Sequence, residues 1–187
     1  HAHAYGGPEL SVKDVKDLLG IELEYYVKVD YQIVKEFVDL IGGVEVDVPM
    51  DIKGTNIKKG VQVLNGEQAL QFLRFRKGYQ DQDLGRIRAQ QQFIKAAAKQ
   101  TLKVSNVGKI PQMIKSYYNN VETNIPLDLI LKFAASAKDY DLDGMKMATL
   151  PGKPAYINGI SYFICDEEQA ELLVKELFED DQVVYNQ

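Results

Sequence analysis

Arginine side chains gather in one short segment near the middle of the chain, between Leu73 and Gln92. The charged residues there are Arg74, Arg76, Lys77, Arg86 and Arg88, with Asp81 and Asp83 among them. A planar guanidinium group can hold a phosphate or pyrophosphate through two parallel hydrogen bonds. The residue types therefore indicate an anion-binding site. The alternative is a solvated network of salt bridges, which would contribute little to stability.

Two of these arginines are predicted to lie on the same side of the chain. Leu73-Arg74-Phe75-Arg76 alternates apolar and cationic residues, as an extended segment does. In such a segment Arg74 and Arg76 point to one side and Phe75 points into the core. Two guanidinium groups on one side suit a single phosphate or pyrophosphate group.

A long predicted helix supplies a third arginine. Apolar residues repeat with a helical period over 86–103, directly after Gly85. Arg86 would lie in the first turn, where free backbone N–H groups and the helix dipole attract an anion. Gln90, four residues further on, shares the face of Arg86. Arg88 is turned from Arg86 by about 200° and is expected to face away from the site.

Helix and strand patterns alternate along the rest of the chain. Amphipathic spacing predicts helices near residues 11–19, 33–41, 66–73, 109–119, 127–138 and 167–179. Alternating apolar residues predict strands at 23–30, 44–48, 145–150 and 161–166, with a loop or hairpin over 51–64. This order predicts an α/β fold, a three-layer α-β-α sandwich with a central mixed sheet. No linker is visible, so residues 1–187 are predicted to form a single domain.

Composition and charge exclude several classes of protein. The 187 residues are 45% hydrophobic and 26% charged, which is ordinary for a globular domain. No run approaches the roughly 18 apolar residues of a membrane-spanning helix, and a disulfide scaffold is excluded because Cys165 is the only cysteine. The net charge of −5 combines an acidic C-terminal segment with the cationic centre. A nucleic-acid partner is therefore not expected.

Several short motifs occur in the order and spacing of a known protein family. They are Tyr5-Gly6-Gly7-Pro8, Tyr25-Tyr26-Val27-Lys28-Val29-Asp30, Val38-Asp39-Leu40-Ile41-Gly42-Gly43, Leu64-Asn65-Gly66-Glu67-Gln68-Ala69, the arginine segment above, and Leu150-Pro151-Gly152 with Tyr156-Ile157-Asn158-Gly159. With these motifs the sequence resembles the LytR–CpsA–Psr family of cell-envelope proteins over nearly its whole length. The DNA-binding role that older names in this family suggest is disfavoured, because no helix-turn-helix pattern is visible and the net charge is negative.

The resemblance implies a phosphotransferase on the outer face of the cytoplasmic membrane, mainly in Gram-positive bacteria. Family members move an anionic glycopolymer, teichoic acid or capsule, from an undecaprenyl-pyrophosphate lipid carrier to peptidoglycan. The alternative is a non-catalytic polyprenyl-phosphate-binding or scaffold protein of the cell envelope. The enzyme hypothesis expects the gene to encode the family's metal-binding aspartates upstream of His1, and the binder hypothesis expects it not to encode them.

Position by position, the resemblance also implies roles for individual residues. Arg74, Arg76 and Arg86 match arginines that contact the pyrophosphate, and Asp83 matches an acid that is either the general base or an orienter of the arginines. The substrate-binding candidates are Lys28 and Gln90 near the head group, and Phe72, Phe93, Ile94 and Ala97 along an apolar lipid tunnel. From the residues alone, ordinary core is the favoured interpretation of these four apolar side chains, and the resemblance makes the two interpretations about equal.

The resemblance implies Mg²⁺ as cofactor, held on aspartates in an opening region of the domain. No part of the sequence matches that region, so we expect the metal ligands, the opening strands and an N-terminal membrane helix to precede His1 in a longer protein. No metal ligand is predicted within residues 1–187. A smaller departure from the family is Ala89, where many members carry a second arginine.

Overall fold

The computed structural model describes residues 2–76, 78–79, 83–103, 106, 108–118, 121–136, 139, 141–142 and 144–178. Contacts divide the chain into two compact units, one of residues 27–145 and one that joins residues 1–26 to 146–187. Each unit is described by itself below. Both units combine helices with strands, in agreement with the α/β class predicted from the sequence.

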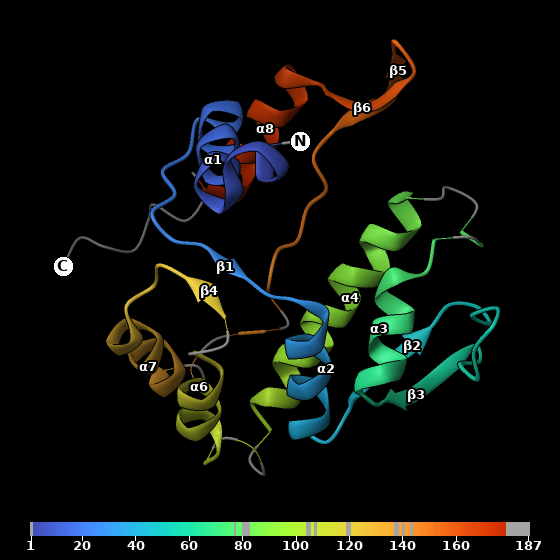
Figure 1. Ribbon diagram of the computed structural model, residues 1–187, viewed down its shortest axis with the longest axis vertical. Coiled ribbons are helices and arrows are strands. Elements are labelled where there is room, and N and C mark those ends of the chain that lie inside the picture. Colours follow the sequence, from blue (N-terminus) through green and yellow to red (C-terminus); the bar gives the residue numbers. More distant parts are fainter. Residues whose placement is uncertain are drawn as a thin grey trace. The chain divides into compact units, whose positions relative to one another are not determined.

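The larger unit carries most of the helices. Its elements are β1 (Val27–Lys28), α2 (Tyr31–Leu40), β2 (Val44–Val48), β3 (Gly60–Leu64), α3 (Gly66–Arg74), α4 (Asp83–Thr101), α6 (Ile110–Tyr118), β4 (Glu122–Thr123) and α7 (Leu127–Ser136). β1 pairs with β4, and β2 pairs with β3, both antiparallel. Figure 1 shows the β2–β3 hairpin beside α3 and α4.

The core of this unit lies between the β2–β3 hairpin and the helices. Alternate residues of a strand face opposite sides, so Val44, Val46 and Val48 are buried while the residues between them are exposed. Phe72 of α3 and Phe93 of α4 belong to the same core, with their ring centroids 6.4 Å apart. Apolar packing therefore holds α3 and α4 together, and these helices carry Arg74 and Arg86.

Polar contacts fix α2 against α3. The side chain of Asp39, near the end of α2, accepts a hydrogen bond of 2.7 Å from the backbone N–H of Gly66 at the start of α3. Lys35 and Glu67 form an ion pair of 3.1 Å between the same helices. Asn65 and Gln68 form a capping box at the first turn of α3. The end of α2 thus meets the start of α3, and the two helices run antiparallel.

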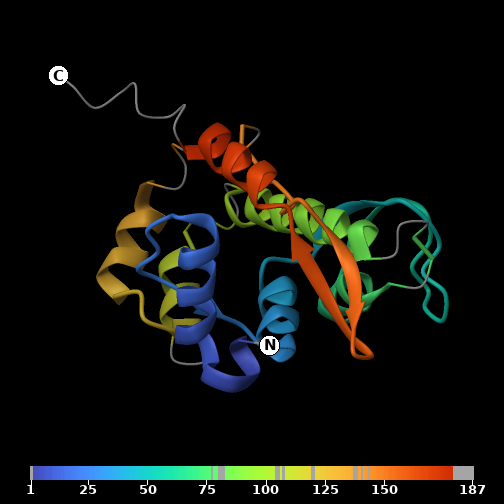
Figure 2. The ribbon, with the colours of Figure 1, turned by 90° about the horizontal axis from the view of Figure 1, so that it is seen from above.

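The smaller unit contains α1 (Ala2–Leu19), β5 (Gly152–Ile157), β6 (Ile160–Cys165) and α8 (Glu167–Phe178). The helical path of α1 is interrupted at Gly6 and Gly7, in the Tyr-Gly-Gly-Pro segment. β5 and β6 form an antiparallel hairpin, seen in Figure 2. Its turn is Asn158-Gly159, with φ of 52° and 78°, which is the backbone conformation for which this pair of residues is favoured.

Two of the four predicted strands are confirmed, one is much shorter than predicted and one is wrong. The strand over 44–48 is confirmed to the residue, and the strand near 161–166 is found as β6. The predicted strand over 145–150 is wrong, because no strand includes these residues and β5 begins at Gly152. Of the predicted strand over 23–30, only Val27–Lys28 is a strand, because β4 pairs with no more than these two residues.

The pairing of strands differs from the expected central sheet. Among the described residues, the strands pair as three separate two-stranded antiparallel sheets. A single central mixed sheet is not among these pairings, and the single domain over 1–187 stays a prediction. In the part of the chain that the structure describes, no helix is both long and apolar enough to cross a membrane.

Candidate anion-binding site

A pocket of about 560 Å³ opens between α2, α3 and α4 in the larger unit. Its polar walls come from Asp30, Tyr31, Arg74, Arg76, Arg86 and Gln90. Its apolar walls come from Val29, Val34, Leu70, Leu73, Phe93 and Ile94. The structure therefore brings the three predicted arginines together and places an apolar surface next to them.

Arg74 reaches the pocket from a helix end rather than from an extended segment. α3 continues through Arg74, and the backbone becomes extended only at Phe75, so the predicted extended segment over 73–76 is wrong at its start. The guanidinium of Arg74 lies over the ring of Tyr31, with its carbon 4.8 Å from the ring centroid. A cation is also favoured in the last turn of a helix by the helix dipole.

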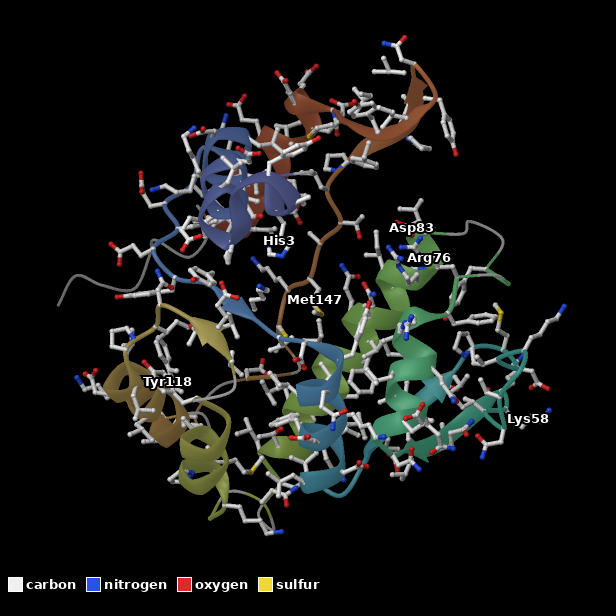
Figure 3. The ribbon with its side chains drawn as sticks, in the orientation of Figure 1. His3, Lys58, Arg76, Asp83, Tyr118 and Met147 are labelled. Carbon is white, nitrogen blue, oxygen red and sulfur yellow. The ribbon has the colours of Figure 1, made fainter. Side chains whose placement is uncertain are left out.

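Asp83 links the other two arginines. Its Oδ1 lies 2.8 Å from Nη2 of Arg86 and 3.8 Å from Nε of Arg76. Figure 3 shows Arg76 and Asp83 close together beside the start of α4. Arg86 is the more enclosed, with 19% of its side chain exposed against 65% for Arg76. Its Nε is buried and has no hydrogen-bond partner among the described residues, so one donor of this guanidinium is left without an acceptor.

Gln90 holds the end of α3. Its Nε2 donates a hydrogen bond of 3.2 Å to the backbone carbonyl of Leu73. The last carbonyls of a helix have no partner within the helix, so Gln90 satisfies one of them and ties α4 to the turn that carries Arg74.

Helical geometry separates Arg86 from Arg88 as predicted. Arg86 and Gln90 line the same pocket, whereas Arg88 lines a second hollow with Tyr79 on another face of α4. Tyr79 is buried, and this burial raises the pKa of its phenol, while the positive charge of Arg88 lowers it by less. The Tyr79 hydroxyl has no hydrogen-bond partner in the described part of the chain.

Three other candidate residues lie outside the pocket. Phe72 is fully buried, and Ala97 packs against the same core, so both are core residues rather than pocket walls. Lys28 forms an ion pair of 2.5 Å with Glu122 across the β1–β4 pair and does not line the pocket. Tyr31 lines it but was not predicted from the sequence. The signal for it was weak, since it was only an aromatic residue following the N-cap Asp30.

The described residues of the pocket do not fit a magnesium ion. The carboxylate of Asp83 is paired with arginines, and the carboxylate of Asp30 accepts a hydrogen bond of 2.8 Å from the backbone of Ile33. Within the described ranges, no group of three or more histidine, cysteine, aspartate or glutamate side chains could hold a metal ion. No chemical step through a metal is derived from these residues.

Comparison with known proteins identifies relatives over nearly the whole chain. The model of the LytR_cpsA_psr family matches residues 1–179. The polyisoprenyl-teichoic acid–peptidoglycan teichoic acid transferase TagU of Bacillus subtilis (strain 168) is 32% identical over 181 residues, which cover 96% of this chain and 59% of TagU. The transferase TagV of the same organism is 31% identical over 189 residues, which cover 95% of this chain and 48% of TagV.

Solved structures agree with these matches. The crystal structure of B. subtilis TagV superposes with a TM-score of 0.80 at 29% identity, covering 95% of this chain and 73% of that one. The structure of TagT bound to LI-WTA superposes with a TM-score of 0.79 at 27% identity, covering 96% of this chain and 69% of that one. The chain spans about half to three fifths of the length of the curated relatives named above. By its sequence and its fold, the chain belongs to the LytR–CpsA–Psr family.

Proposed function

We propose that this protein takes part in moving a teichoic-acid-type glycopolymer from a polyprenyl-pyrophosphate carrier to peptidoglycan, on the outer face of the cytoplasmic membrane. The observation that carries the proposal is the convergence of Arg74, Arg76 and Arg86 on one pocket with an apolar wall. The printed names of TagU and TagV, which describe teichoic acid transferases, agree with it.

The cationic part of the pocket suits the pyrophosphate. In the transfer, a hydroxyl oxygen of the acceptor forms a bond to the phosphorus that carries the polymer. The bond from that phosphorus to the bridging oxygen breaks, and polyprenyl phosphate leaves with the electron pair. The hydroxyl proton passes to a base or to water. Guanidinium groups stabilise the negative charge on the equatorial and leaving oxygens, which is the main contribution a protein makes to phosphoryl transfer.

Asp83 is proposed to orient the arginines rather than to act as the base. Its Oδ1 faces Nη2 of Arg86 and Nε of Arg76 at once. Its carboxylate is therefore engaged with the arginines, which leaves it poorly placed to take the proton of an acceptor hydroxyl. The 2.8 Å contact holds the guanidinium of Arg86 in place before a substrate arrives, and the same oxygen attracts the more exposed Arg76, which reduces the reorganisation that binding requires.

The apolar wall suits the start of a prenyl chain. Phe93 is buried and lines the pocket together with Leu70 and Leu73, while Ile94, also in its lining, is 53% exposed. Covering such a partly exposed aliphatic side chain with a hydrocarbon is favourable. Magnesium is retained in the proposal as the cofactor that the family implies, and if bound it would supply Lewis-acid stabilisation of phosphate oxygens.

Farnesyl pyrophosphate binding to the Arg74→Ala, Arg76→Ala and Arg86→Ala variants tests the proposal. Each loss of a charge-assisted contact is expected to weaken binding by about tenfold or more. Arg88→Ala is the matched control, because Arg88 lies two residues from Arg86 on the same helix but lines a different hollow. Unchanged affinity in all three variants, or an equal loss in Arg88→Ala, would contradict the site.

A transfer assay with the full-length protein then separates the enzyme from a binding protein. The proposal expects polymer to move from the lipid carrier to peptidoglycan, and expects the three pocket variants to lose that activity. Tight lipid binding without any transfer would instead support the non-catalytic polyprenyl-phosphate binder.

A further inference from the structure

Tyr31 touches the arginine site without carrying a charge of its own. It is the first residue of α2 and lines the pocket, and the guanidinium carbon of Arg74 lies over its ring, 4.8 Å from the ring centroid. We propose that Tyr31 is a positioning residue, which holds Arg74 in the orientation that binds the pyrophosphate. This inference rests on the proposed function and extends it to a residue outside the predicted arginine segment.

The antiparallel packing of α2 and α3 brings these two residues together. At one end of the pair, the side chain of Asp39 binds the backbone N–H of Gly66. Tyr31 and Arg74 lie at the opposite end, at the start of α2 and the end of α3. The contact is therefore set by the helix pair and does not depend on a loop.

The stacking leaves Arg74 able to bind an anion. A guanidinium carries five N–H donors, and the Tyr31 ring lies on one side of it, with the guanidinium carbon 4.8 Å from the ring centroid. The ring thus restricts rotation of a long side chain that is otherwise exposed, and the donors that point away from the ring stay available for phosphate oxygens. Binding then costs less side-chain entropy than it would with a mobile arginine.

Gln90 fixes the same turn from the other side. Its hydrogen bond to the carbonyl of Leu73 holds the backbone next to Arg74. Tyr31 from α2 and Gln90 from α4 therefore restrain the side chain and the backbone of one turn of α3. Of the two, Tyr31 makes the direct contact with the guanidinium group.

A double-mutant cycle with Tyr31 and Arg74 tests this role. Affinity for inorganic pyrophosphate and for farnesyl pyrophosphate is measured by calorimetry on the wild type, Tyr31→Leu, Arg74→Ala and the double variant. Loss of a cation–π contact at an exposed site is expected to weaken binding by about two- to fivefold in Tyr31→Leu. Tyr31→Phe keeps the ring and is expected to bind as the wild type does, and Tyr31→Trp at least as tightly.

The outcomes distinguish the inference from the proposed function. If Tyr31 acts through Arg74, Tyr31→Leu causes no further loss once Arg74 is alanine. The same loss in both backgrounds would overturn the positioning role, as would wild-type affinity in Tyr31→Leu while Arg74→Ala binds weakly. If Arg74→Ala itself binds normally, the proposed pyrophosphate site fails. Tyr156→Leu, at a tyrosine that is 78% exposed in the smaller unit, is the control for unspecific effects.

Discussion

Oδ1 of Asp83 lies 2.8 Å from Nη2 of Arg86, one helical turn further along α4. The same oxygen lies 3.8 Å from Nε of Arg76, which belongs to the segment after α3. One carboxylate thus connects the arginines of two different elements. The proposed orienting role of Asp83 follows from this connection, and it differs from the role of a base in its consequences.

Asp83→Asn is expected to lower the rate of polymer transfer by about tenfold, and Asp83→Ala is expected to lower it by more. Asparagine keeps an oxygen that can accept a hydrogen bond from Arg86, whereas alanine removes it. In Asp83→Asn, kcat/KM should be lower at every pH, while its rise and fall with pH should occur at the same pH values as in the wild type. Disappearance of the limb that rises from acid pH would show that Asp83 is the base instead.

Ile94→Ser tests the apolar wall. Ile94 lines the pocket and is 53% exposed, so covering it with a prenyl chain is expected to contribute to lipid affinity. The serine variant should bind farnesyl pyrophosphate roughly three- to tenfold more weakly and inorganic pyrophosphate as the wild type does. Val61→Ser, at a site on β3 that is 70% exposed, provides the control. An equal loss of affinity for both ligands would show that the substitution disturbs the anion site and not the contact with the prenyl chain.

Gly66→Ala tests whether the α2–α3 packing positions the site. A Cβ atom at Gly66 would lie 2.2 Å from the backbone carbonyl oxygen of Lys35, so the two helices must separate to admit it. The free energy of unfolding should fall by about 1–3 kcal/mol, and pyrophosphate affinity should fall with it because Tyr31 and Arg74 move apart. Gly108→Ala is the control, since no described atom lies within 4 Å of its Cβ position. Unchanged stability in Gly66→Ala would contradict the close approach.

Tyr79→Phe is expected to stabilise the protein by about 1 kcal/mol. The Tyr79 side chain is buried, and its hydroxyl has no hydrogen-bond partner in the described residues, so removing the hydroxyl removes an unpaired polar group. Denaturant unfolding of the two proteins at neutral pH measures the difference. Tyr156→Phe, at an exposed site, should leave stability unchanged, and a destabilised Tyr79→Phe variant would show that the hydroxyl has a partner.

The same substitution carries a pH prediction. Burial raises the pKa of Tyr79 in the folded protein, so above about pH 10 the unfolded chain releases this proton more readily than the folded chain does. The wild type should therefore lose stability as the pH rises through that range. Tyr79→Phe lacks this contribution, and its advantage over the wild type should grow with pH. An advantage that shrinks above pH 10 would contradict the raised pKa.

Local periodicity was sufficient wherever residues depend only on their own element. The strand over 44–48 alternates buried and exposed residues as predicted. Arg86 and Gln90 share a helix face, and Arg88 does not, because this follows from the helical period alone. The three arginines could be selected from residue type and spacing, and Asp83 from the family resemblance. The structure brings the arginines to one pocket, with Asp83 beside Arg76 and Arg86.

Contacts between elements were decided only by the tertiary structure. Phe72 and Ile94 are both apolar helix residues, yet one is fully buried in the core and the other stands half-exposed at the pocket wall. Arg74 ends a helix instead of lying in an extended segment, and it reaches the pocket because α2 and α3 pack antiparallel. The stacking of Arg74 on Tyr31 joins residues 43 positions apart. Such a contact cannot be predicted from the periodicity of the sequence, because its geometry arises from the packing of two helices and not from either helix alone.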